Sequence, residues 1–321
     1  MLPPEAPPGA RPEGREHRVL TTVRDLEITV VMDNLSDGLL ASGPEVDRYG
    51  LTGGASLSVP LVSEHGLSYF ISWTAEGERH HLLLDFGLSA GGTRHNLEQL
   101  GLDPGRVEAL VLSHGHFDHF GGLAALRPLL PAGIPFYAGA DVFRHRYLVA
   151  GGVRADVGAL DPGLVEGFRV ELLEAPREVL PGAWLSGPIA RTTPFETGSP
   201  YLLVETPAGV VADTFPGEQA LAFPTPEGLV VISSCAHAGI VNTVRHLQAV
   251  TGVERVAAVL GGFHLSGAPR ERVEATVDAL AVLEPARLVP MHCTGLQAWQ
   301  RFAERLPEAT AVNAVGSRWR F

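Results

Sequence analysis

Three histidines and one aspartate lie within six positions of the chain, at His114, His116, Asp118 and His119. In an extended segment alternate side chains point to the same side, so His114 and His116 can present two imidazoles to one ion. Asp118 and His119, where the chain begins to turn, can face a second ion. Imidazole binds ions such as zinc, copper, iron and nickel, and a carboxylate beside it favours an ion that retains a water molecule. The spacing predicts a metal site, against the alternative of a solvated histidine-rich loop.

The elements around this cluster follow the order strand, ligand loop, helix. An apolar β-type run over 107–112 precedes the cluster, and Gly121-Gly122 leads into a helical pattern. The same order recurs three times near the C-terminus, where His237, His264 and His292 each follow an apolar strand. Functional groups collect at strand ends in layered α/β folds, so we expect these histidines to share one crevice with the cluster.

These later histidines have competing interpretations. We predict that His237 and His292 are metal ligands rather than helix caps. The first cluster supplies only four donor groups, and the metal sites need further ligands to be complete. His264 is expected to contact substrate or to support a ligand by a hydrogen bond. Of the two cysteines, Cys235 stands at a strand end and is competent as a thiolate ligand, although small residues packed at strand ends would look the same.

The periodicity predicts a β-rich first half and an α/β second half. The expected strands are 26–32, 69–73, 81–84, 107–112, 134–137, 201–205, 210–212, 229–232, 256–260 and 288–291. The expected helices are 93–100, 123–127, 240–250, 270–283 and 296–306. Residues 1–20 are predicted to be a disordered tail, and 21–321 a single domain with an irregular insertion at about 140–194 that covers or borders the site.

Composition narrows the class of protein. The 321 residues are 45% hydrophobic, enough for a large core, and the net charge of −12 argues against non-specific binding of nucleic acid or an anionic membrane. All 24 basic residues are arginine, which excludes a catalytic lysine. Two cysteines and no signal-peptide pattern predict a soluble, cytoplasmic protein with a small-molecule substrate. The sequence does not indicate the oligomeric state.

The motif set resembles the metallo-β-lactamase fold superfamily, whose mark is SHGHFDH at 113–119. Within it, the chain is similar to the 7,8-dihydropterin-6-yl-methyl-4-(β-D-ribofuranosyl)aminobenzene 5′-phosphate synthase-like branch. The motifs that carry this similarity are Asp33-Asn34, EHGLS at 64–68, DFG at 85–87, CAHAGIVN at 235–242, GGFHL at 261–265 and HCTG at 292–295. The resemblance implies an α/β fold, a four-layer αββα sandwich with one or two metal ions along one edge of the sheets.

The resemblance also implies how the ligands divide. One ion would be held by His114, His116 and His237, and the other by Asp118, His119 and His292. The superfamily usually has a bridging aspartate in a Gly-Asp step after a later strand; Asp213 and Cys235 are the candidates for that place here. The groups expected to hold a ligand or to contact substrate are Asp85, His65 and Asn34.

The chemistry expected from such a site is hydrolysis. One or two divalent ions, with zinc expected and iron or manganese as alternatives, would lower the pKa of a bound water from ~15.7 towards ~7. Asp118 would orient that water, with His264 as a second catalytic group, on a small phosphorylated or ester substrate. The alternatives are a pterin-pathway, phosphate synthase-like condensing enzyme and a non-catalytic, metal-bound sensor or binding module on the same fold.

Overall fold

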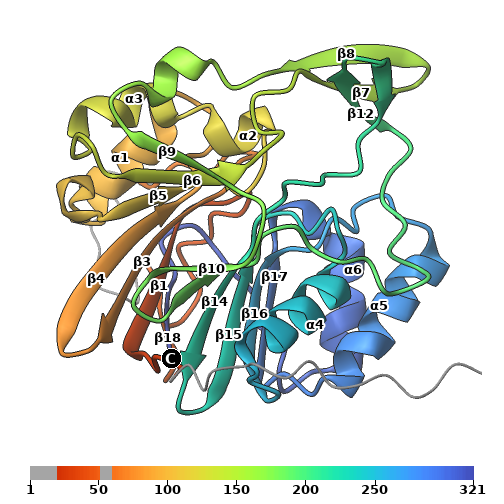
Figure 1. Ribbon diagram of the computed structural model, residues 1–321. Helices are drawn as coiled ribbons and strands as arrows, with labels where there is room; N and C mark the ends of the chain where they lie inside the picture. The colour runs from red at the N-terminus through yellow and green to blue at the C-terminus, as the bar shows by residue number, and fades with distance from the viewer. Residues whose placement is uncertain (1–19, 51–59) are drawn as a thin grey trace, which may run out of the picture.

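Two β-sheets packed face to face form the centre of the computed structural model, which describes residues 20–50 and 60–321 (Figure 1). The expected disordered tail therefore lies outside the described residues, apart from Leu20. The first sheet has eight strands and the second has six. In spatial order the first sheet contains β2 (Val46–Asp47), β18 (Arg318–Arg320), β1 (Arg24–Met32), β3 (Ser68–Ala75), β4 (Glu78–Leu84), β5 (Ala109–Val111), β6 (Pro135–Gly139) and β9 (Arg169–Leu173).

The second sheet carries the three strand–loop–helix units that the sequence predicts. Strands β15, β16 and β17 run parallel, so their carboxyl ends meet at one edge. In the first sheet β4, β5, β6 and β9 are likewise parallel. In spatial order the second sheet contains β10 (Arg177–Leu180), β11 (Ala183–Leu185), β14 (Leu221–Thr225), β15 (Gly228–Ser233), β16 (Val256–Gly262) and β17 (Arg287–Met291).

Helices cover the outer face of each sheet, which confirms the αββα sandwich (Figure 1). The core between the sheets includes Trp73 and Phe223, whose ring centroids lie 5.0 Å apart. The first sheet is covered by α1 (Gly92–Gln99), α2 (Phe117–Phe120) and α3 (Leu123–Leu126), and the second by α4 (Ile240–Thr251), α5 (Arg270–Val282) and α6 (Leu296–Arg305). Short 3₁₀ helices are η2 (Pro104–Arg106), η3 (Arg127–Leu129), η4 (Pro162–Val165) and η5 (His292–Thr294).

The predicted pattern of α4 illustrates why these helices form. Ile240, Val244 and Leu247 are buried against the second sheet, as their spacing indicates. Gly252 ends the helix in the left-handed region, with φ of 75°, and its N–H donates to the carbonyl of Gln248.

None of the helices in the described ranges is long and apolar enough to span a membrane.

The region at about 140–194, which we expected to be an irregular insertion, contains five strands. β9, β10 and β11 extend the two main sheets, while β7 (Arg146–Ala150) and β8 (Val153–Gly158) join β12 (Leu202–Thr206) and β13 (Gly209–Ala212) in a separate four-stranded sheet. This small sheet projects from the sandwich at the upper right of Figure 1. β8 does alternate apolar and polar residues over 153–157, but its first four residues are all exposed, so the alternation does not correspond to one buried face.

Candidate metal centre

The predicted ligands converge at the edge where strands of both sheets end. His114 follows β5, and His116, Asp118 and His119 follow it in the loop and the first turn of α2. Cys235 and His237 follow β15, and His292 begins η5 directly after β17. The first sheet therefore supplies one side of the cluster and the second sheet supplies the other.

His114, His116 and His237 form a three-histidine group. The Nε2 atom of His114 lies 3.1 Å from Nδ1 of His116 and 3.1 Å from Nε2 of His237. A tetrahedral zinc ion with Zn–N bonds of about 2.0–2.1 Å separates its nitrogen ligands by about 3.3–3.4 Å, so the group is close to ligand geometry. Burial and the neighbouring imidazoles lower the pKa of His114 and His237 well below the usual value, and the pKa of His116 falls to about 3. These imidazoles are thus neutral, as metal ligands must be.

Asp118, His119 and His292 form a second group, the carboxylate group. Oδ2 of Asp118 lies 3.4 Å from Nε2 of His292 and 3.7 Å from Nε2 of His119. Burial alone would raise the pKa of Asp118, but His119 and His292 hold it below the usual carboxyl range. Nε2 of His292 is buried and has no hydrogen-bond partner within the described ranges. A buried imidazole nitrogen that lies beside a carboxylate without a hydrogen bond is suited to bind a cation together with that carboxylate.

Asp85 holds two of these imidazoles in the tautomer that a metal requires. Its fully buried Oδ2 accepts from Nδ1 of His119 at 2.7 Å and from Oγ of Ser113 at 2.8 Å. Because the Ser113 hydroxyl donates to Asp85, it accepts from Nδ1 of His114, 2.9 Å away. Both rings therefore keep Nε2 free for the cluster. The sequence predicted the role of Asp85 and missed Ser113, although it begins the SHGHFDH motif.

Asn34 has the same function for His292. Its Oδ1 lies 3.1 Å from Nδ1 of His292, and its Nδ2 donates to the His292 carbonyl at 3.2 Å. Asp33 accepts from the His292 backbone N–H at 3.1 Å. The Asp33-Asn34 pair at the end of β1 thus fixes the ligand that follows β17.

Glu218 anchors the loop that carries His237, and sequence reasoning missed it. Its buried carboxylate accepts from the backbone N–H groups of His237 and Ala238, both at 2.7 Å. Burial raises the pKa of Glu218 to about 7. The Phe215 ring stacks on His237 with centroids 3.8 Å apart and an interplanar angle of 6°. The Gly217-Glu218 step was the available signal, because it places an acid three residues after this aromatic ring.

The structure does not bring Asp213 into the cluster. Its Oδ2 accepts from Nε of Arg146 at 2.8 Å, and Asp141 accepts from Nη2 of the same arginine at 2.6 Å. Arg146 is fully buried beneath the ligand loop: a Cβ atom at Gly115 would lie 2.3 Å from its Nη1. Gly115 thus allows the loop to rest on this ion pair, and Asp213 neutralises the arginine.

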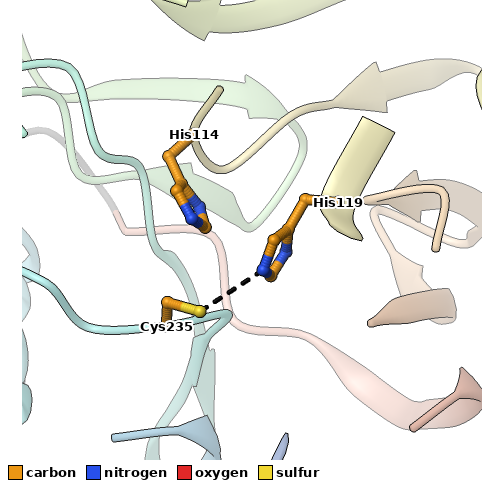
Figure 2. A group of neighbouring side chains, drawn as sticks. All are labelled: His114, His119 and Cys235. Atoms are coloured by element: carbon orange, nitrogen blue, oxygen red, sulfur yellow. Dashed lines mark hydrogen bonds between the residues drawn. The ribbon is translucent and has the colours of Figure 1, made fainter. Parts of the chain in front are cut away.

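Cys235 instead occupies the position beside both groups. Its Sγ atom lies 3.3 Å from Nε2 of His119, and Figure 2 shows His114, His119 and Cys235 pointing toward one another. Burial, followed by the neighbouring Cys293 sulfur, raises the pKa of the Cys235 thiol well above the usual value. The thiol is therefore protonated unless a cation lies next to it.

His264 and His65 flank the cluster. The His264 ring centroid lies 4.3 Å from that of His237, and its buried Nδ1 has no hydrogen-bond partner among the residues described. The side chain of His65 is 62% exposed, stacks on His292 at 4.8 Å and lies 3.7 Å from the Asp118 carboxylate. The exposed His65 therefore lies at the entrance of the candidate site, and His264 lies inside it.

The chain belongs to the metallo-β-lactamase superfamily, whose sequence profile matches residues 64–292. This range contains all of the three-histidine group and all of the carboxylate group. Membership agrees with the αββα sandwich and with donors gathered at one sheet edge.

Three proteins are similar to this chain in sequence or in structure. A Methanocaldococcus jannaschii protein named 7,8-dihydropterin-6-methyl-4-(beta-D-ribofuranosyl)-aminobenzene-5'-phosphate synthase is 32% identical over 262 residues, which cover 79% of this chain and 89% of that protein. Another protein of this archaeon, MJ0448, is 26% identical over 242 residues, 75% of this chain and 88% of its own length. The crystal structure of Tm1679, described as a metal-dependent hydrolase of the β-lactamase superfamily, superposes with a TM-score of 0.70 at 26% identity, covering 92% of this chain and 99% of Tm1679.

Proposed function

We propose that this protein is a metal-dependent hydrolase that acts on a small phosphorylated or ester substrate. The observation that carries the proposal is the buried Nε2 of His292, which makes no hydrogen bond in the described ranges although it lies 3.4 Å from the Asp118 carboxylate. The three-histidine group beside it supports the same conclusion. Similarity to Tm1679, itself described as a metal-dependent hydrolase, agrees with this class.

Each residue of the centre has a proposed role. His114, His116 and His237 would hold one divalent ion, and Asp118, His119 and His292 a second, with zinc expected and iron or manganese as alternatives. When bound, such ions polarise a carbonyl or phosphoryl oxygen and acidify water.

The remaining groups act on water and substrate. The Asp118 carboxylate would orient the attacking water. His264, whose Nδ1 lacks a described partner, and His65 at the entrance would contact the substrate.

The preference for a phosphorylated or ester substrate rests on the reaction class and on the phosphate in the product name of the M. jannaschii relative. Arg146, which could have bound an anionic group, is buried and already paired with Asp141 and Asp213. Arg146 is therefore not available to an anionic group on the substrate, which the proposed metal ions would neutralise.

A condensing enzyme similar to that relative is the second candidate, because the relative is named a synthase and is 32% identical. In this chain either reaction would use the proposed metal centre to activate the substrate. They differ in the nucleophile, which is water in one case and an organic molecule in the other.

The test is a screen of metal-replete protein against phosphodiesters, phosphomonoesters, lactones and thioesters. The His116→Ala variant serves as the blank, and His95→Ala, a histidine on α1 that contacts the Pro60 carbonyl, as the matched control. We expect at least one substrate class to be turned over by the wild type and the His95→Ala protein but not by His116→Ala. Turnover that appears only with a pterin precursor and a second organic substrate would support the condensing enzyme. Ligand binding without turnover, unchanged in His116→Ala, would support the sensor and contradict the hydrolase.

A further inference from the structure

The two cysteines of the chain, far apart in sequence, meet at the metal centre. Cys235 follows β15 and Cys293 lies in η5 after β17, and their Sγ atoms are 3.3 Å apart with no disulfide between them. Strand β16 runs between β15 and β17 in the sheet. The thiols therefore approach each other across the end of an intervening strand.

Gly262, the last residue of β16, makes this approach possible. A Cβ atom at Gly262 would lie 2.6 Å from Sγ of Cys293 and 2.3 Å from the Ser234 carbonyl oxygen. Any other residue would push the Cys293 thiol away from Cys235. The local backbone is thus compatible with a sulfur pair at this place and incompatible with a side chain between them.

The surroundings of the pair are ligand atoms rather than an apolar core. Sγ of Cys235 lies 3.3 Å from Nε2 of His119. The Sγ atoms of both cysteines and a ring nitrogen of His292 all lie within 4.8 Å of one another. Cysteines that serve only as small buried hydrophobes would face aliphatic side chains. Here both sulfurs face the edge of the cluster where Nε2 of His292 has no described partner.

We propose that Cys235 and Cys293 are thiolate ligands of the ion held by the carboxylate group, which makes this position a mixed nitrogen, oxygen and sulfur site. The proposal rests on the proposed metal centre and adds Cys293 to its ligands. With Asp118, His119 and His292 the ion would have five ligands, and two sulfurs bound at about 2.3 Å with an angle of about 90–120° between them lie about 3.3–4.0 Å apart. The observed separation of 3.3 Å falls at the lower end of that range. Thiolates favour zinc, cobalt and iron(II) over magnesium and manganese, so the position should discriminate between these ions.

Cobalt(II) substitution tests this proposal directly, because a cobalt–thiolate bond gives a charge-transfer band in the near ultraviolet that nitrogen and oxygen ligands do not give. The chain has two cysteines, so each contribution can be removed in turn. With the full chain loaded with cobalt, we expect the band in wild type, about half its intensity in Cys293→Ser and in Cys235→Ser, and no band in the double variant. His116→Ala should lose the other ion and keep the band. Cobalt affinity at the thiolate position should fall at least tenfold in Cys293→Ser.

Two results would overturn the proposal: cobalt bound to the wild type without the band, or a Cys293→Ser protein with the full band. Absence of any bound cobalt in a folded wild-type chain would contradict the metal centre itself and is distinguishable from both. If Cys293→Ser does not fold, alkylation of the wild type replaces it. Removal of metal should then accelerate modification of both thiols, and re-addition of cobalt should reverse it, whereas equal rates at Cys293 with and without metal would contradict the role of that thiol.

Discussion

At the scale of single residues, the candidate centre contains residues that orient the candidate ligands through hydrogen bonds, in addition to the candidate ligands themselves. Asp85 accepts hydrogen bonds from Nδ1 of His119 and from Ser113, which in turn accepts from His114. Residue types and spacing were enough to predict the ligand candidates and Asp85. Ser113 and Glu218 were not predicted, because their residue types alone do not reveal a hydrogen bond to Asp85, 28 residues from Ser113, or to the backbone of His237, 19 residues from Glu218.

The Asp85→Asn variant tests whether the Asp85 carboxylate orients the His119 ring for metal binding. The amide cannot accept from His119 with the strength of a carboxylate, so we expect about 10- to 100-fold weaker metal binding, measured by competition with a chromogenic chelator. Asp156→Asn is the matched control, because Asp156 also pairs with a histidine, His145, but on the exposed small sheet. Equal metal affinity in wild type and Asp85→Asn would contradict the account of how His119 is held.

At the scale of elements, the buried strands and the β12–β13 hairpin were predictable, whereas β7 and β8 were not. β16, for example, is buried along its whole length and appears in sequence as one apolar run. β7 and β8 carry arginines and lie in a sheet apart from the main core, and the short alternation over 153–157 does not mark a buried face. β14 contains Pro224, a residue typical of strand interruptions, yet it pairs with β15 throughout.

Arg146, the first residue of β7, connects the small sheet to the candidate metal centre, because its side chain lies beneath the loop that carries His114 and His116. Arg146→Ala would leave Asp141 and Asp213 as buried, unpaired carboxylates beneath the ligand loop, so we expect a loss of about 3–5 kcal/mol in the free energy of unfolding. Chemical denaturation of the metal-free protein measures it. Arg154→Ala, an exposed arginine on β8, should change stability by no more than about 0.5 kcal/mol. A similar small change for Arg146→Ala would show that the buried ion pair does not support the loop.

At the scale of the whole molecule, the two sheets meet at the centre from opposite sides. The ligand loop after β5 belongs to the first sheet, and His237, Cys235 and His292 follow strands of the second. An ion held by ligands from both sheets binds the folded chain and not the unfolded chain. Metal binding should therefore stabilise the whole sandwich.

Chelation measures this coupling. With free metal at about 1,000 times its Kd, linkage predicts about 4 kcal/mol of added stability, so removal of metal should lower Tm by several degrees. The His116→Ala protein should respond less to the chelator than wild type, because it has lost a ligand of the three-histidine group. Identical melting curves with and without chelator would contradict an ion shared between the sheets.

The most direct test of the central claim is the metal content of the full chain purified without chelator, measured by elemental mass spectrometry. The arrangement of His114, His116, His237, Asp118, His119 and His292 predicts between one and two equivalents of zinc, iron or manganese per chain, with less in His116→Ala and an unchanged amount in His95→Ala. A folded protein that contains no transition metal, and takes up none when zinc, manganese or iron is added, would contradict the claim.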